Sequence, residues 1–361
     1  MSLFSPSFLC GVKFGKNIYA SATKFNGLVK VCIDDGRAEC ILQFPGSELS
    51  IENQHSRAYI VKGKICFAPA WGDYIHIFDP KTNEIESYII GRRDYKLEYY
   101  GVLYNEKIIL SPKMRGGDFL CFNLETMENS VLMKWEKIES YIPEYVKYTF
   151  LRVTQVDGIL FLPLYDTSQI LTINLESLEL KVLHVQVDNL LGIFNGANNL
   201  FLLSNSKSTV YMWNSLKNEV RECESEGTLE SDNYYTFTAK LNEQTYFFPG
   251  YSFSWIGKEY LGKIKKIVQL ENTADKLLFS EPFCGDKMIW ALPFQGEEML
   301  CISEKGIESK KISTIKLEYL DKKLFCGSKV SNKRMLCEGD DLSIEEFVQG
   351  VVNLEGNVYE K

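Results

Sequence analysis

The sequence predicts an all-β fold built from one repeated unit, and three observations support this prediction. A plan of short apolar runs separated by polar turns recurs along the 361-residue chain with a spacing of about 44 residues. Each run is only about five to eight residues long, which is too short for an unaided helix. Aromatic residues make up 13% of the chain, including 20 Tyr and 22 Phe, and this enrichment favours strands.

The clearest copies of the repeat span residues 60–87, 102–129 and 156–180. Each copy has a polar turn, an apolar run that ends in proline, a polar loop, a second apolar run, and then Asp or Asn before another turn. The marker position at the end of the first run carries Ala22, Pro69, Pro112, Pro163, Ser204, Pro249, Pro293 and Ser328. A period near ~44 residues matches four-stranded propeller blades of ~40–50 residues. We therefore predict an all-β, β-propeller fold of about eight four-stranded blades.

The predicted blades form a single domain over residues 1–361, because no linker or low-complexity stretch separates them. Their expected spans are 8–45, 57–90, 99–132, 149–185, 190–223, 233–270, 280–312 and 315–350. The last step between markers is short, so seven blades closed by pairing the N-terminal strand with C-terminal strands is the alternative.

The second unit illustrates the expected strands, which lie at 57–62, 64–70, 74–79 and 84–90. The turns between them contain Lys-Gly, Trp-Gly-Asp and Pro-Lys-Thr-Asn, which are residues typical of tight turns. Residues 131–153 break the even spacing. We expect this long connection to contain a short helical turn or an extended rim loop.

One stretch resembles a known repeat. The sequence IHIFDPKTNEIESY at 75–88 looks like the turn between the third and fourth strands of kelch-type propellers, and 122–131 and 173–182 are looser copies. Kelch repeats carry a Gly-Gly pair after the second strand, where this chain has Ala-Pro or Ser-Pro. They also carry Trp after the turn, where it has Ile85, Asn129 or Leu180. The chain is thus similar to a divergent kelch-like or generic bacterial propeller, which implies a fold but no activity.

Composition narrows the function classes. The net charge of −8 argues against a nucleic-acid groove, and no apolar run approaches the ~18 residues of a membrane span. The N-terminus lacks the pattern of a secretory signal. Ten cysteines without a CxxC pair then indicate reduced thiols in a cytoplasmic protein. With only three histidines, we expect no metal and no cofactor.

The candidate binding surface is the propeller face formed by the loops between second and third strands and between blades. Loops on a rigid scaffold commonly carry function. On this face we place Trp71, Asp73, Arg92, Arg93, Tyr95, Arg115, Tyr165, Asp166, Tyr251, Phe294 and Glu297. Aromatic side chains with arginines suit peptide anchoring, sugar stacking or anionic ligands.

Catalytic motifs are not found. G-x-S-x-G, the phosphate loop and H-E-x-x-H are absent, so whether the chain is an enzyme stays open, leaning towards no. We interpret His76 and His184 as strand residues and place His55 in a loop on the candidate face. The leading hypothesis is a non-catalytic propeller that binds a peptide or protein partner.

Two alternatives remain. One is a carbohydrate-active propeller, a glycoside hydrolase or lyase, or a carbohydrate binder that uses Asp73, Asp166 or Glu297 with nearby aromatics. The other is a structural scaffold within a larger assembly, which predicts an exposed apolar patch on one rim.

Overall fold

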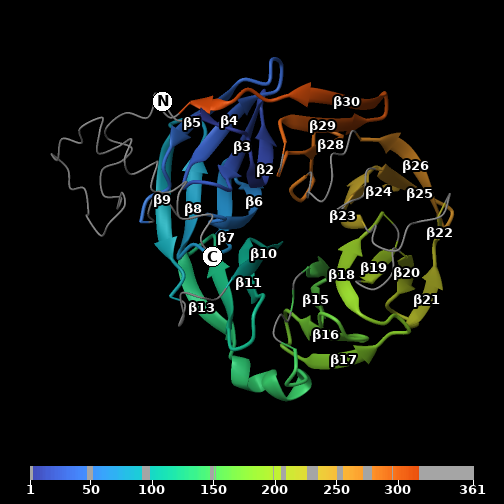
Figure 1. Ribbon diagram of the computed structural model, residues 1–361. Coiled ribbons are helices and arrows are strands. Elements are labelled where there is room, and N and C mark those ends of the chain that lie inside the picture. The colour runs from blue at the N-terminus through green and yellow to red at the C-terminus, as the bar shows by residue number, and fades with distance from the viewer. Residues whose placement is uncertain are drawn as a thin grey trace, which may run out of the picture. The chain divides into compact units, whose positions relative to one another are not determined.

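The computed structural model of the chain is all-β, and its strands form a β-propeller of seven blades (Figure 1). It describes residues 3–46, 52–91, 98–146, 150, 152–197, 199–204, 209–225, 235–249, 255–270, 279–294 and 296–316. Each blade is a sheet of four consecutive antiparallel strands, and the sixth blade gains a fifth strand at its outer edge.

The described residues fall into two compact units. The first contains the residues up to Ile89, 292–299 and those from Ser309 onward, and the second contains 90–291 and 300–308. Blades 1 and 2 belong to the first unit. Blade 1 consists of β2 (Phe8–Phe14), β3 (Asn17–Ala22), β4 (Leu28–Cys32) and β5 (Ala38–Leu42). Blade 2 consists of β6 (His55–Val61), β7 (Lys64–Pro69), β8 (Tyr74–Asp79) and β9 (Glu84–Ile89).

Blades 3 to 6 belong to the second unit. Blade 3 has β10 (Tyr99–Tyr104), β11 (Lys107–Pro112), β12 (Phe119–Asn123) and β13 (Glu128–Met133). Blade 4 has β14 (Thr154–Val156), β15 (Ile159–Pro163), β16 (Gln169–Asn174) and β17 (Leu180–His184). Blade 5 has β18 (Leu190–Asn195), β19 (Leu200–Ser204), β20 (Val210–Asn214) and β21 (Glu219–Glu222). Blade 6 has β23 (Tyr235–Leu241), β24 (Gln244–Pro249), β25 (Trp255–Tyr260) and β26 (Lys263–Gln269).

Blade 7 draws on both ranges, with β27 (Phe283–Gly285), β28 (Met288–Ala291), β29 (Glu298–Ser303) and β30 (Gly306–Lys311). Two short pairings lie outside the four-stranded plan. The strand β22 (Glu224–Ser225) pairs in parallel with β26, and β1 (Leu3–Phe4) pairs with β31 (Ile315–Lys316) (Figure 1).

The marker residues end the second strand in six of the seven blades, and in blade 7 Pro293 follows shortly after the end of β28. Ala22, Pro69, Pro112, Pro163, Ser204 and Pro249 are the last residues of β3, β7, β11, β15, β19 and β24. In blade 2, the ladder between β7 and β8 extends from Ile65 to Phe67, so Pro69 lies beyond the end of this ladder. The missing N–H of the proline therefore removes no hydrogen bond there.

The turn between third and fourth strands has one design in five blades. Its fifth residue turns the chain with a positive φ and is Gly36, Asn83, Met127, Leu178 or Asn218, with φ between 54° and 70°. In blades 2 to 5 the side chain of the first residue caps the turn: for example, Asp79 Oδ1 accepts from Lys81 N at 2.8 Å, and Asn174 Oδ1 accepts from Glu176 N at 2.9 Å. This is the segment whose sequence resembles the kelch turn.

The seven-bladed alternative is the fold that is observed, and the preferred count of eight is wrong for the described residues. The predicted eighth unit, 315–350, lies outside these residues except for β31. The strands β1 and β31 pair with each other in a separate two-stranded sheet and join no blade. Every described blade therefore has its four strands from one consecutive stretch of the chain. The observed fold is a β-propeller, and none of its features is specific to kelch repeats.

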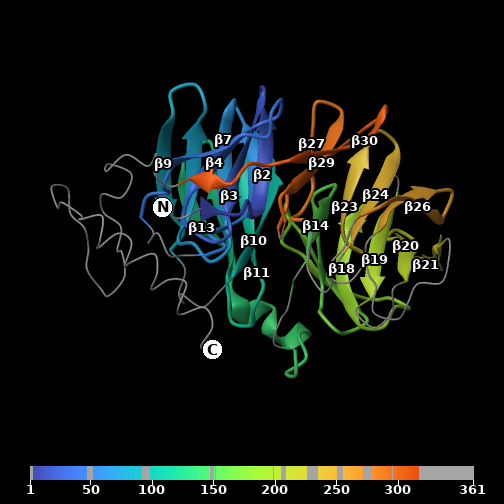
Figure 2. The same cartoon turned by 45° about the horizontal axis from the view of Figure 1, so that its top comes forward.

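The long connection at 131–153 forms short helical turns, as expected. Two 3₁₀ turns, η1 (Trp135–Lys137) and η2 (Glu139–Tyr141), follow β13 (Figure 2). Among the described residues, no helix is long and apolar enough to cross a membrane.

Candidate functional site

The predicted loop residues lie in the expected loops where the structure describes them. Trp71 and Asp73 lie between β7 and β8, Arg115 between β11 and β12, Tyr165 and Asp166 between β15 and β16, and Phe294 and Glu297 between β28 and β29. Arg92, Arg93, Tyr95 and Tyr251 lie outside the described residues. A binding role for these residues stays a prediction.

Arg115 supports the connection that follows blade 3. Its guanidinium donates to the carbonyl oxygen of Pro143 at 3.1 Å and to Glu139 Oε1 at 3.3 Å. The same guanidinium lies over the Trp135 ring, 5.9 Å from its centroid. These contacts use several donors of Arg115 within the chain, so the side chain holds local structure as well as lining a surface.

The remaining described residues of the set also have local contacts. Tyr165 of blade 4 packs partly buried against the core between blades 5 and 6, in the second unit. Asp166 is exposed, and its backbone N–H donates to Leu190 O at 2.9 Å. In the first unit, Glu297 pairs with Lys311 at 2.6 Å, with both side chains well exposed to solvent. An ion pair this exposed contributes little to stability.

Residues 134–146, called the rim segment below, form the most elaborate structure near a predicted residue. Trp135, Ile138, Ile142 and Val146 are at most 6% exposed and pack into the core of blades 3 and 4. The Trp135 N–H donates to Asp118 Oδ1 at 2.8 Å. Together with Arg115, these contacts fix the rim segment against its blade.

The outer side of the rim segment presents two tyrosines to solvent. Tyr141 is 40% exposed and Tyr145 is 75% exposed. A shallow pocket of about 500 Å³ lies beside them, lined by Arg115, Glu139, Ser140, Tyr141, Ile142, Pro143, Glu144 and Gln169. Exposed tyrosines on a fixed segment beside a pocket are typical of a recognition surface.

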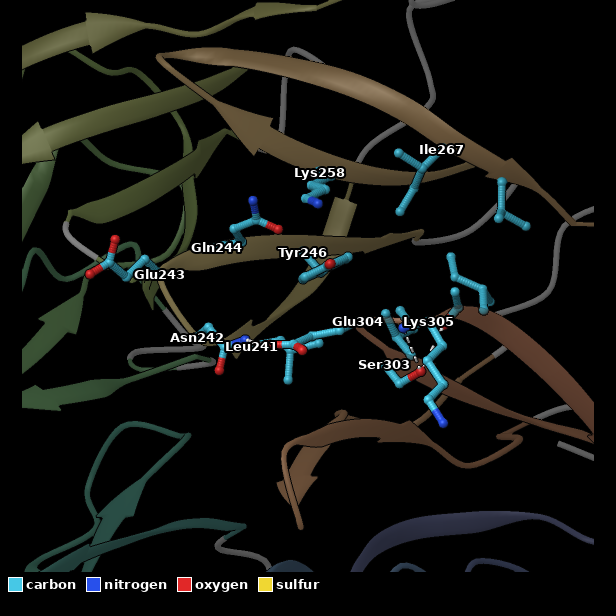
Figure 3. Close-up of a pocket in the computed structure, with 14 residues that line it drawn as sticks. Leu241, Asn242, Glu243, Gln244, Tyr246, Lys258, Ile267, Ser303, Glu304 and Lys305 are labelled. Atoms are coloured by element: carbon cyan, nitrogen blue, oxygen red, sulfur yellow. Dashed lines mark hydrogen bonds between the residues drawn. The ribbon is translucent and has the colours of Figure 1, made fainter.

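A second, larger cavity was not predicted from the sequence. This groove of about 940 Å³ lies between blades 6 and 7, within the second unit (Figure 3). It is lined by Leu241, Asn242, Glu243, Gln244, Tyr246, Lys258, Ile267, Val268, Ile302, Ser303, Glu304, Lys305, Gly306 and Ile307. The side chains of Asn242 and Glu304 bridge the two blades with a hydrogen bond of 2.6 Å.

On the blade 6 side the groove is lined by the turn between β23 and β24 and by residues of β24, β25 and β26. On the blade 7 side it is lined by residues 302–307, around the turn between β29 and β30. Ile267, Val268 and Ile307 pack there only partly buried against the core. The lining residues include aliphatic side chains, two glutamates and two lysines, so the groove offers apolar contact and charges of both signs. Neither His nor Cys is among them.

Two of the three histidines meet in the first unit. His55 Nε2 lies 2.8 Å from His76 Nδ1, His55 Nδ1 lies 2.9 Å from Ser21 Oγ, and His76 Nε2 lies 3.0 Å from Pro45 O. A carbonyl oxygen only accepts, so His76 Nε2 carries hydrogen. Its Nδ1 then accepts from His55 Nε2, and His55 Nδ1 accepts from the Ser21 hydroxyl. The chain of hydrogen bonds thus has one direction when both rings are neutral.

This serine and these histidines do not form an accessible catalytic site. Both histidines are fully buried and Ser21 is 1% exposed, so a substrate carbonyl does not reach Ser21 Oγ. Burial lowers the pKa of His76 to about 4 and lowers the pKa of His55 well below its ordinary value. The interpretation of His76 as a structural strand residue agrees with this burial, whereas His55 begins strand β6 instead of lying in a surface loop.

The cysteines in the described residues are free thiols, and Cys10, Cys40, Cys66, Cys121 and Cys223 are buried. Burial raises the pKa of Cys40 and of Cys66 to about 12, which keeps these thiols protonated. In the described part of the chain, no group of three or more His, Cys, Asp or Glu side chains is arranged to hold a metal ion.

Solved structures similar to this chain are propellers of diverse biology. A catalytically inactive variant of virginiamycin B lyase from Staphylococcus aureus, solved with quinupristin, shares 14% identity over 85% of this chain and 94% of its own, with a TM-score of 0.58. A streptogramin B lyase shares 13% identity over 74% of this chain and 86% of its own, with a TM-score of 0.55. An extracellular domain from B. thetaiotaomicron shares 9% identity over 85% of this chain and 38% of its own, with a TM-score of 0.57.

These likenesses establish the fold and leave binding and catalysis equally open, because all three identities are low. No family model matches the chain, and no curated protein matches it by sequence.

Proposed function

We propose that this protein is a non-catalytic β-propeller that binds a peptide or protein partner through the rim segment and the loops beside it. The observation that carries the proposal is the pair of exposed tyrosines, Tyr141 and Tyr145, on a segment fixed from below by Arg115 and Trp135. Interface hot spots are rich in Tyr, Trp and Arg.

Preorganisation strengthens this argument. Four buried anchors and the Asp118 hydrogen bond already hold the rim segment, so a partner does not have to order it. Tyrosine has few rotatable bonds and combines an apolar ring with a polar hydroxyl, which lowers the entropic cost of binding. The pocket next to Tyr141 offers room for one side chain of a partner, with the carboxylate of Glu144 at its edge.

The alternative is a carbohydrate-active propeller or a carbohydrate binder. Its candidate acids have other surroundings: Glu297 is paired with Lys311, and Asp166 stands at a turn with a positive φ. The buried Ser21–His55–His76 chain does not supply an accessible nucleophile. We therefore retain the carbohydrate alternative as an outcome of the test rather than as a second proposal.

The test selects peptides from a random library against the full chain and measures their affinity by fluorescence anisotropy. The double variant Y141A/Y145A is expected to weaken binding at least tenfold, because two anchors are truncated. R115A is expected to weaken binding too, through loss of support for the rim segment, whereas R115K should retain part of the affinity.

The matched control is V131A, which removes a half-exposed apolar side chain from the outer strand β13 of the same blade. Its affinity should equal that of the unmodified chain. Failure to select any peptide, or equal binding by Y141A/Y145A and the unmodified chain, contradicts the proposal. Binding to a glycan array instead, with loss of binding on removal of acids, would support the carbohydrate alternative.

A further inference from the structure

Four exposed apolar side chains gather on one kind of turn in the second unit. They are Leu178, Leu216, Tyr260 and Leu261, which are 39%, 97%, 55% and 83% exposed. All lie where the third strand of a blade joins the fourth, in blades 4, 5 and 6. We call these side chains the turn tips. Their exposure places apolar surface in water without any contribution to the core.

The turn chemistry does not call for leucine at these positions. Leu178 and Leu261 have φ values of 57° and 51°, in the left-handed region that favours Gly and Asn. At the position of Leu178, blades 1, 2 and 5 carry Gly36, Asn83 and Asn218, and blade 3 carries Met127. At the position of Leu216, blade 2 carries Lys81 and blade 3 carries Glu125. Exposed leucines that the local fold disfavours point to a role at the surface.

The turns of blades 5 and 6 are joined. The Glu224 N–H donates to Gly262 O at 3.2 Å, and β22 extends from blade 5 to pair with β26 of blade 6 (Figure 1). A Cβ on Gly262 would lie 3.9 Å from Met212 Cε of β20. The turn with Tyr260 and Leu261 is therefore held against the residues that follow β21 in blade 5, and Leu216 lies in the turn that precedes β21.

Lysines concentrate beside the tip of blade 6. Residues 258–266 contain four lysines and one acid, Glu259. Lys258 lies over the Tyr246 ring and Lys266 over the Trp255 ring, 5.4 Å and 5.5 Å from the ring centroids. The Lys265 ammonium lies over the exposed Tyr260 ring, 5.6 Å from its centroid. One of the four, Lys263, is paired with Glu224 at 2.6 Å, and both side chains are exposed.

Acids flank the other tips. Glu219 and Glu222 follow the Leu216 turn, which also carries Lys217. Glu176 and Glu179 surround Leu178, so the basic excess does not extend to blade 4. A negatively charged surface would therefore approach blade 6 most closely, whereas Leu216 lies before the start of β21, at the end of that strand away from Glu224 and the blade 6 turn.

We propose that the turn tips dock this protein on an anionic lipid membrane, with Leu261, Tyr260 and Leu216 entering the headgroup region. Aliphatic side chains flanked by lysines bind such surfaces by burial of apolar area and by attraction to anionic lipids, and tyrosine favours the interface. The tips are convex and separate. A fluid lipid surface moulds around such protrusions, whereas a protein partner would need a matching concave surface.

This surface is independent of the proposed peptide site. The rim segment leaves the end of β13 that leads to the next blade, whereas the turn tips lie at the opposite ends of the strands in their blades. A peptide and a membrane would thus contact opposite ends of the strands in the second unit.

The test measures co-sedimentation of the full chain with vesicles of phosphatidylcholine containing phosphatidylserine, and with vesicles of phosphatidylcholine alone. Binding is expected on the anionic vesicles and is expected to weaken with added salt. L216S/L261N should lower the partition coefficient at least tenfold, since two exposed leucines no longer enter the interface. K265Q/K266Q should lower the affinity and its salt dependence.

Two controls keep the result interpretable. The L261N change places Asn before Gly262 in a tight turn that favours this pair, so it separates docking from folding. I60S/I89S removes two exposed isoleucines elsewhere and should leave vesicle binding unchanged. Equal sedimentation with neutral and anionic vesicles, no sedimentation, or unchanged binding by L216S/L261N overturns the proposal. Self-association of the chain that L216S/L261N abolishes also overturns it, because a second copy would then cover the tips.

Discussion

At the residue scale, side chains from distant segments complete the local structures. Arg115 stands between β11 and β12 and supports the rim segment about two dozen residues later, at Pro143 and Glu139. The sequence predicts that Arg115 lies in a loop, because it follows the marker proline. The identity of its partners depends on how the long connection folds back, which no short pattern contains.

The histidine pair shows the same limit. His55 and His76 are separated by a β-hairpin's length of sequence, and their hydrogen bond depends on the pairing of β6 with β7 and of β7 with β8. The alternation of His76 with Ile75 and Ile77 correctly indicates a strand position. Both rings pack against Phe44 in an aromatic core. This core tolerates the two polar side chains because their ring nitrogens are hydrogen-bonded to each other, to Ser21 and to Pro45.

The pair also makes the stability of the fold depend on pH. An unfolded histidine takes up a proton as the pH falls below about 6.5, whereas burial keeps His76 neutral until about pH 4. The unfolded state therefore gains protons in this window, and stability falls as the pH falls from 6.5 to 4. His76 alone should account for a loss of about 3 kcal/mol, and the lowered pKa of His55 adds to it.

Urea denaturation between pH 4 and pH 7 checks this prediction. H76Q removes one titrating group, so its free energy of unfolding should depend less steeply on pH than that of the unmodified chain. The comparison uses the slope, because H76Q also loses hydrogen bonds and is less stable at every pH. Identical slopes for the two proteins would show that His76 is not kept neutral by burial.

At the element scale, the turn between third and fourth strands is the most regular feature. The resemblance of residues 75–88 to a kelch turn correctly located it, and the looser copies at 122–131 and 173–182 fold in the same way. Side-chain capping by Asp79, Asn123 and Asn174 explains why Asp or Asn recurs at the start of the turn. The same motif does not predict Leu178, Leu216 or Leu261, because the conformation of the turn does not require leucine at these positions.

The turn of blade 6 provides a prediction about stability. Leu261 and Gly262 have φ values of 51° and 79°, so both central residues of this tight turn are left-handed. Asparagine adopts this conformation more readily than leucine, and Leu261 buries little surface. L261N is expected to raise the free energy of unfolding by about 0.5–1 kcal/mol, as measured by urea denaturation. A lower stability would mean that Leu261 makes contacts that support the turn.

At the scale of the whole molecule, the repeat correctly predicts a propeller, and seven blades are observed where eight were preferred. Blade 2 was expected at 57–90, and its strands span His55–Ile89. The count of eight depended on a last unit without a marker proline. The groove between blades 6 and 7 could not be predicted, because it depends on how the turn between β29 and β30 lies against blade 6, which the repeat pattern does not contain.

Function at this scale depends on which surface a partner covers, and the most direct measurement is amide hydrogen exchange of the full chain with and without a selected peptide. Exchange slows where a ligand covers or orders the backbone. We expect slower exchange in residues 134–146 and in the loop that contains Arg115, with unchanged exchange at the turns between third and fourth strands. Slower exchange confined to other loops, with the rim segment unaffected, would contradict the assignment of the binding surface.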